Sequence, residues 1–124
     1  MSNVNDEAIF SMQVIIDHEV CSKSSLLRYL EERGLFDVDA PINGLYLPND
    51  PMFAQELGCA CFSSNPIPAY KEGMLGELQR IELSPDGQTM MAGDATSAQR
   101  VVDAVTRLQA TIKVALINGD LVLA

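Results

Sequence analysis

The residues of this chain whose types could carry out chemistry stand together in one segment, Asp17, His18 and Glu19. His18 is the only histidine, and an imidazole between two carboxylates could serve as a general base or share a divalent metal with them. The amide of Asn43 could complete such a site. In an extended strand, however, residues 17 and 19 face one way and residue 18 the other. We therefore expect no catalytic site here, and we expect His18 to lie on the surface just before a helix.

The three cysteines offer a second candidate site. Cys59 and Cys61 form a C-x-C pair, which is shorter than the C-x-x-C spacing of zinc knuckles and thioredoxin-like sites. Together with Cys21 and His18 they would supply the four ligands of a zinc site. An odd number of cysteines does not make a disulfide framework, and buried cysteines behave as small apolar side chains. We expect buried thiols and no bound metal, with the zinc site as the alternative.

Four amphipathic segments predict the helices that must position these residues. Three of them begin near a side chain that can cap a helix: a serine among residues 22–25, Asp50, and Asp94 or Thr96. The same three are followed by a glycine or an Asn-Gly pair, which is typical of a helix end. The first expected helix begins after Ser22, Ser24 or Ser25 and ends at Arg33. The other three run over residues 52–57, 69–81 and 96–117.

The last and longest of these helices is predicted to organise the core, because its apolar residues recur every three or four positions. Its buried face would consist of Val101, Val105, Leu108 and Ile112. After the helix ends, the apolar segment Leu121–Leu123 is expected to return across the core as a tail.

Two short apolar runs, residues 9–16 and 45–47, predict extended segments, and the Ser-Pro-Asp-Gly sequence at 84–87 predicts a turn. The expected fold class is therefore α-rich α+β, with about four helices arranged around a long C-terminal one. We expect a single domain over residues 1–124, with the polar residues 1–8 flexible.

The overall charge limits the partners of the chain. Its 124 residues include 17 Asp and Glu against 8 Lys and Arg, which gives a net charge of −9. Because nucleic-acid binding replaces the counterions of phosphates with Lys and Arg, so acidic a chain disfavours nucleic acid and favours a basic protein partner. No apolar run reaches the roughly 18 residues of a membrane span, and no signal segment leads the chain, so we expect a cytoplasmic protein.

Four short motifs, taken in order, resemble those of a known family. They are Gln13-Val14-Ile15-Ile16-Asp17-His18-Glu19-Val20, Asn43-Gly44-Leu45-Tyr46-Leu47-Pro48, Asn65-Pro66, and Tyr70 ahead of an amphipathic run. Over roughly residues 12–81 the chain is similar to the AHH-type nuclease domains, small toxin modules of the histidine–metal (HNH-like) ββα superfamily. The resemblance implies a scaffold on which a strand histidine activates water, an asparagine at the position of Asn43 orients that base, and a divalent metal stabilises the leaving oxygen.

The chain departs from this family where the chemistry would take place. The resemblance places the paired histidines at Gln13 and Val14, and the later histidine pair falls in a stretch of serines, prolines and Asn65. A valine can neither bind a metal nor accept a proton, and a glutamine is not a general base near neutral pH. Losing the base and the metal ligands together removes several powers of ten in rate. The chain therefore resembles the scaffold of this family but lacks the residues that would carry out its reaction, and we expect no cofactor.

Three functional hypotheses follow from these observations. The leading one is a non-catalytic protein-interaction module on a degenerate nuclease-like scaffold, associated with bacterial toxin systems as an immunity-like, chaperone-like or regulatory partner. The alternatives are an active metal-dependent HNH-like nuclease toxin that uses His18 with nearby carboxylates, and an unrelated small helical protein. The apolar faces that one small domain must cover, among them Ile9-Phe10, further predict a homodimer.

Overall fold

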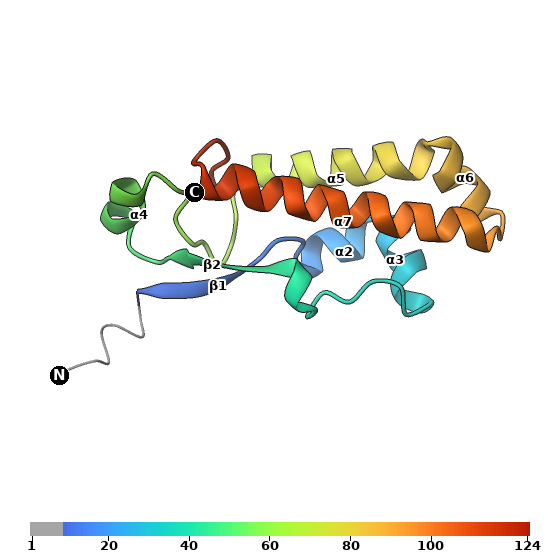
Figure 1. Ribbon diagram of the computed structural model, residues 1–124, viewed down its shortest axis with the longest axis horizontal. Coiled ribbons are helices and arrows are strands. Elements are labelled where there is room, and N and C mark those ends of the chain that lie inside the picture. The colour runs from blue at the N-terminus through green and yellow to red at the C-terminus, as the bar shows by residue number, and fades with distance from the viewer. Residues whose placement is uncertain (1–8) are drawn as a thin grey trace.

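The computed structural model describes residues 9–124, so the flexibility expected of residues 1–8 lies outside it. Within that range the fold is rich in helix and contains a small two-stranded antiparallel sheet, which agrees with the expected α-rich α+β class. Figure 1 shows the long helices in one layer, with the sheet and the first two helices beneath them. The elements are β1 (Phe10–Val14), α2 (His18–Lys23), α3 (Ser25–Glu32), the 3-10 helix η1 (Pro41–Asn43), β2 (Gly44–Pro48), α4 (Pro51–Leu57), α5 (Pro68–Leu83), α6 (Pro85–Met91) and α7 (Ala95–Ile117).

The sheet pairs β1 with β2 in antiparallel register, with Met12 opposite Tyr46 at its centre. At the end nearest α2 the ladder continues for one more residue, since Ile15 N donates to the Asn43 carbonyl at 2.8 Å. Side chains alternate along a strand, so Met12 and Tyr46 share one face while Gln13 lies on the other. Gln13 is buried and Met12 and Tyr46 are exposed, which identifies the face that meets the rest of the chain.

Short polar side chains begin the helices where the sequence predicts them. Ser24, Asp50 and Asp94 each accept a hydrogen bond from the backbone N–H three residues further on, at 3.2, 3.1 and 2.9 Å. Gly58 ends α4 in the left-handed conformation, with a φ of 74°, which glycine adopts at little cost. The predicted bounds of these helices are confirmed to within one or two residues.

Two short helices, α2 and α6, correct the sequence prediction. The chain around His18 is not extended, because Asp17 caps α2 by accepting from Val20 N at 2.9 Å and His18 is the first helical residue. The Ser-Pro-Asp-Gly segment is not a turn, because Ser84 caps α6 and Pro85 occupies its first position, where a missing N–H is harmless. The two errors have different causes. The first prediction carries the alternation of the strand past Asp17, which can also cap a helix. In the second, the short polar residues that favour turns also begin helices.

The core lies between α7 and the layer beneath it. Val101 and Val105 are buried as predicted, whereas Leu108 and Ile112 are half-buried and pack against the margin of the core. The buried position at that level of α7 belongs instead to Gln109. The predicted face of α7 is therefore confirmed at its first two residues and wrong at the other two, because the helix is rotated to bring an amide inward.

The C-terminal tail returns across the core as predicted. Leu123 is buried, and its carbonyl accepts a hydrogen bond from Ile67 N at 3.0 Å, just before α5 begins. Nearby, Ala60 N donates to the Leu116 carbonyl at 2.8 Å and so attaches the loop after α4 to the end of α7. The two bonds hold the last residues of the chain against its middle.

The longest helix, α7, has 23 residues and carries charged side chains on its outer side, among them Asp103 and Arg107. Such a helix is amphipathic rather than apolar all round. Among the helices of residues 9–124, none has the length and apolarity that crossing a membrane requires.

Two leucines of α7 should differ in what they contribute to stability, because Leu116 is fully buried and Leu108 is half-buried. We expect Leu116→Ala to lower the free energy of unfolding by about 2–5 kcal/mol through the cavity that it leaves, and Leu108→Ala to lower it by less. Urea unfolding followed by circular dichroism measures both losses. Val114→Ala, on the exposed side of the same helix, is the control and should change stability little. Equal losses for the two leucines would contradict this orientation of α7.

Candidate functional site

The centre of the structure holds a buried amide, that of Asn43, which is 1% exposed. Its Oδ1 accepts from Ile16 N at 3.0 Å and from Gln109 Nε2 at 3.1 Å. Its Nδ2 donates to the carbonyls of Ile16 and Val38, both at 2.9 Å. All four hydrogen-bonding positions of the amide are therefore occupied. Asn43 connects the end of β1, the loop before η1, and α7, and it has no free position left for a substrate.

A second buried amide, Gln13, lies on the inward face of β1. Its Oε1 accepts from Ser63 N at 2.9 Å, which holds the loop after α4 against the sheet. Tyr70, near the start of α5, donates its hydroxyl to the Ile15 carbonyl at 2.7 Å, and burial raises the pKa of this phenol. Helix α5 and the loop after α4 therefore meet around the end of β1. Gln13 is buried there and Val14 faces outward.

Asp17, His18 and Glu19 do not converge on one point. Asp17 caps α2, and the exposed imidazole of His18 makes no hydrogen bond or ion pair within residues 9–124. Both carboxylates form ion pairs with Lys71 of α5, whose Nζ lies 2.7 Å from Glu19 Oε1 and 3.6 Å from Asp17 Oδ2. The same Nζ donates to Asn65 Oδ1 at 2.9 Å, and the Lys71 side chain is only 12% exposed.

These contacts shift the pKa values of the groups that make them. Hydrogen bonds from Lys71 and then from Lys23 hold the pKa of Glu19 below its usual value. The bond to Glu19, aided by the charges of Asp17 and Glu19, raises the pKa of Lys71. Both side chains therefore stay charged throughout the neutral range. A carboxylate held ionised by a lysine has a lowered affinity for protons, so Glu19 is poorly suited to act as a general base.

The alternative catalytic site of His18, Asp17, Glu19 and Asn43 is not assembled by these contacts. Asn43 is enclosed by its four hydrogen bonds, whereas His18 lies on the exposed first turn of α2. Over residues 9–124, no three His, Cys, Asp or Glu side chains are grouped closely enough to hold a metal ion.

The three cysteines are likewise not gathered with His18 into a shared site. Cys21 is buried in α2, and burial, with smaller effects from nearby carboxylates, raises the pKa of its thiol to about 12. Cys59 and Cys61 are half-buried in the loop after α4, and burial also raises the pKa of Cys61. Cys21 therefore lies apart from the pair Cys59 and Cys61, in a different element of the fold.

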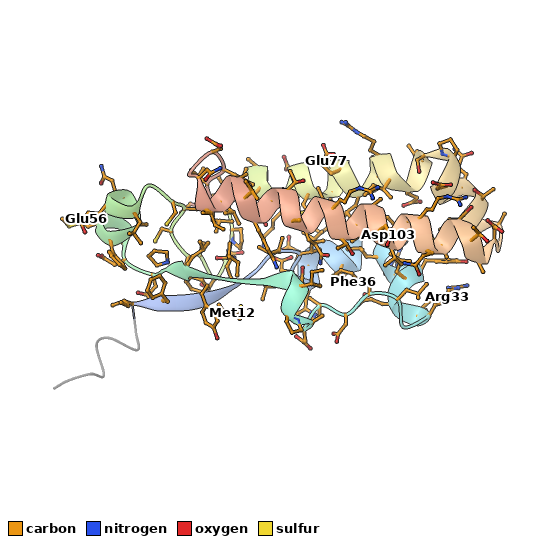
Figure 2. The ribbon with its side chains drawn as sticks, in the orientation of Figure 1. Met12, Arg33, Phe36, Glu56, Glu77 and Asp103 are labelled. Carbon is orange, nitrogen blue, oxygen red and sulfur yellow. The ribbon has the colours of Figure 1, made fainter. Side chains whose placement is uncertain are left out.

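The outward face of the sheet is apolar. It carries Phe10, Met12 and Val14 from β1 and Tyr46 from β2, with exposures between 36% and 65%. Figure 2 shows Met12 at the margin of the molecule, directed away from the helices. Phe10 packs edge-on against Phe53 of α4, with 5.7 Å between the ring centroids. An antiparallel sheet with one face in water usually carries polar residues on that face, so this one is suited to contact another surface.

A groove between α5, α6 and α7 gathers three of the eight basic side chains, Arg80, Arg100 and Arg107. Its volume is about 410 Å³. Two acids line the same groove: Asp103, and Asp86, which accepts from Arg100 Nε at 2.9 Å. The charges within it nearly balance, so the groove lacks the excess of positive charge that phosphate binding requires.

Sequence reasoning missed two side chains that decide this arrangement, Gln109 and Lys71. Gln109 could have been found, because it lies four residues after Val105 and three before Ile112, in the middle of the apolar stripe. A polar residue in such a position needs a buried partner. Lys71 gives no such signal, because its partners lie in another part of the sequence.

Comparison of the chain with protein-family models, with curated proteins and with solved structures gives no match. The nuclease resemblance therefore stays a prediction from the motifs quoted above.

Removing the Asn43 side chain should destabilise the fold more than removing its partner on α7. Asn43→Ala leaves the Ile16 N–H and two buried carbonyls without partners, and we expect it to lower the free energy of unfolding by about 3 kcal/mol or more. Gln109→Ala removes one of the four bonds and should cost about 1–3 kcal/mol. Urea unfolding measures both. A smaller loss for Asn43→Ala than for Gln109→Ala would contradict the central role of Asn43.

The ion cluster at Lys71 should contribute to stability in a pH-dependent way. The pKa of Glu19 is lowered in the fold, so its contribution is present above the usual value of 4.5 and is lost as the pH falls through the lowered value. The pKa of Lys71 is raised, so its contribution is present below 10.5 and is lost as the pH rises through the raised value. We expect Lys71→Met to return the pKa of Glu19 toward 4.5, as measured by NMR titration of the carboxyl group.

Arg28→Met is the matched control for this titration, because Arg28 is an exposed cation of α3 outside the cluster. It should leave the pKa of Glu19 unchanged. If Lys71→Met also leaves it unchanged, the lysine does not hold this carboxylate in solution.

Proposed function

We propose that this protein is a non-catalytic protein-interaction module on a nuclease-like scaffold, and that it acts in bacterial toxin systems as an immunity-like, chaperone-like or regulatory partner. The observation that carries the proposal is that the buried amides at the centre of the structure, Asn43 and Gln13, are hydrogen-bonded to other parts of the chain. Where the resemblance calls for paired histidines, the chain has the buried amide of Gln13 and the outward-facing Val14, neither of which can act as a base near neutral pH. At the position of the orienting asparagine, Asn43 has all four of its hydrogen-bonding positions occupied.

The packing of three elements supports the scaffold. The antiparallel pair β1 and β2 is contacted by α5, whose Tyr70 donates to the backbone at the end of β1. Along the chain these elements are not consecutive, because α2, α3 and η1 separate the two strands and α4 precedes α5. The loop in which the family carries its later histidines also reaches the site, since Ser63 contacts Gln13.

The side chains that remain near the site support the absence of catalysis. Val14 points to the opposite side of the sheet from Gln13, so a histidine pair at these two positions would not converge on one metal. Glu19 is neutralised by Lys71, and His18 stands alone on the surface. A base without an orienting partner and without a metal contributes little to phosphodiester cleavage.

The net charge of −9 supports a basic protein as the partner. Charges of opposite sign steer two proteins together, whereas an acidic surface repels the phosphates of nucleic acid. The groove with three arginines does not alter this, because Asp86 and Asp103 line it as well.

A cleavage assay with one variant tests the proposal. The purified chain should leave plasmid DNA intact in Mg²⁺, Mn²⁺ or Zn²⁺, should be harmless when expressed, and should contain no stoichiometric metal by elemental analysis. The physical reason is that residues 9–124 hold no grouped set of metal ligands, and that His18 has no hydrogen-bond partner there to orient it as a base. His18→Ala separates the alternatives, because the active nuclease would depend on this residue. Metal-dependent cleavage that disappears in His18→Ala would establish the nuclease and overturn the proposal.

A further inference from the structure

We propose that a cavity between α3, α7 and the loop that joins α3 to η1 binds a small neutral molecule with an apolar body and one N–H or O–H donor. The cavity has a volume of about 280 Å³, and Gln109 of α7 forms part of its wall. It is called here the α3–α7 cavity. This inference goes beyond the proposed function, because such a ligand can bind whether or not the chain has a protein partner.

The side chain of Gln109 has a buried oxygen without a partner. Its Nε2 donates to Asn43 Oδ1 at 3.1 Å, whereas its Oε1 accepts no hydrogen bond from any of residues 9–124, although Gln109 is only 2% exposed. The orientation of this amide is fixed by chemistry. Asn43 Nδ2 donates to two carbonyls, so Asn43 Oδ1 is an acceptor and only the nitrogen of Gln109 can bond to it. Because buried polar atoms almost always have a partner, Oε1 requires a donor that the described chain does not supply.

The rest of the cavity wall is mostly apolar. It includes the fully buried Leu30 of α3, the buried Val105 of α7, and the half-buried Phe36 and Val102. A water molecule is held in a cavity by two to four polar partners, and most of this wall offers none. A molecule that is apolar except for one donor satisfies both the wall and the oxygen of Gln109.

The cavity is open to solvent and large enough for a small ring compound. Leu35 and Ile42 line it and are 41% and 46% exposed, so a ligand can enter between α7 and the loop after α3. An enclosed apolar cavity of about 150 Å³ holds benzene. A volume of about 280 Å³ is therefore suited to a molecule of one or two rings.

The charges indicate that the ligand is neutral. The exposed carboxylate of Asp37 also lines the cavity, and with the net charge of −9 it repels an anion. An ionised group of either sign would lose its hydration against the apolar wall. A neutral N–H or O–H group does not carry this cost, because it exchanges its hydrogen bond to water for one to Gln109 Oε1.

The test compares indole with indene, which has the same shape but carries a CH₂ group in place of the N–H. Indole at millimolar concentration should shift the NMR signals of the Gln109 side-chain amide and of the backbone amides of Val102 and Thr106 in the full chain. Indene should bind at least about tenfold more weakly, because it leaves Oε1 without a partner.

Two variants of α7 locate the binding. Thr106 is half-buried in the cavity wall, so Thr106→Phe should fill part of the volume and weaken indole binding at least about tenfold. Thr111→Phe is the matched control, because Thr111 is an exposed residue of the same helix outside the cavity, and it should leave the affinity for indole unchanged. Circular dichroism shows whether each variant keeps the fold. If Thr106→Phe does not fold, the comparison of indole with indene on the wild-type chain decides.

Three results would overturn the inference. The first is that indole shifts none of these signals. The second is that indene binds as tightly as indole, since the oxygen of Gln109 would then have no part in binding. The third is that Thr111→Phe weakens binding as much as Thr106→Phe does.

Discussion

The amide of Asn43 is the contact on which the arrangement of the other elements depends. A buried amide is tolerated only when each of its positions finds a partner, because an unpartnered polar atom costs about 1–3 kcal/mol. The partners here come from the end of β1, the loop before η1 and helix α7. Moving any one of these segments would leave the others with unpaired groups. The amide therefore fixes the rotation of α7 and explains why Gln109, rather than an apolar residue, occupies the buried position there.

The same constraint bears on function. An asparagine that orients a catalytic base must keep one of its atoms available to that base. Asn43 has none, because backbone groups and Gln109 use all four positions. The carboxylates nearby also have partners: Asp17 accepts a hydrogen bond at the start of α2, and Glu19 accepts one from Lys71. Asp17, Glu19 and Asn43 are thus each held in a contact that maintains the fold, whereas the exposed His18 makes no hydrogen bond or ion pair within the described residues.

The parts of the fold that could be predicted from the sequence are those with local causes. Helix α7 and the capped helices α3 and α4 follow from periodicity and from side chains within three residues of their ends. Helices α2 and α6 could not be predicted in this way, because Asp17 and Ser84 are as typical of turns as of helix starts. The contacts of Gln13 and Asn43 could not be predicted in this way either, because their partners lie in other parts of the sequence. The bond between Lys71 and Glu19 joins residues that are 52 positions apart, so the sequence around one residue does not indicate the other as its partner.

The direction in which β1 faces is the clearest case of a feature that alternation alone cannot decide. Alternation separates Met12 and Val14 from Gln13, and the usual rule would turn the two apolar residues inward. The buried loop contact of Gln13 reverses that choice, because its Oε1 receives the Ser63 N–H that would otherwise have no partner there. The apolar side of β1 is then left on the outside. The buried amide of Gln13 and the exposed apolar face of the sheet are therefore two consequences of one strand orientation.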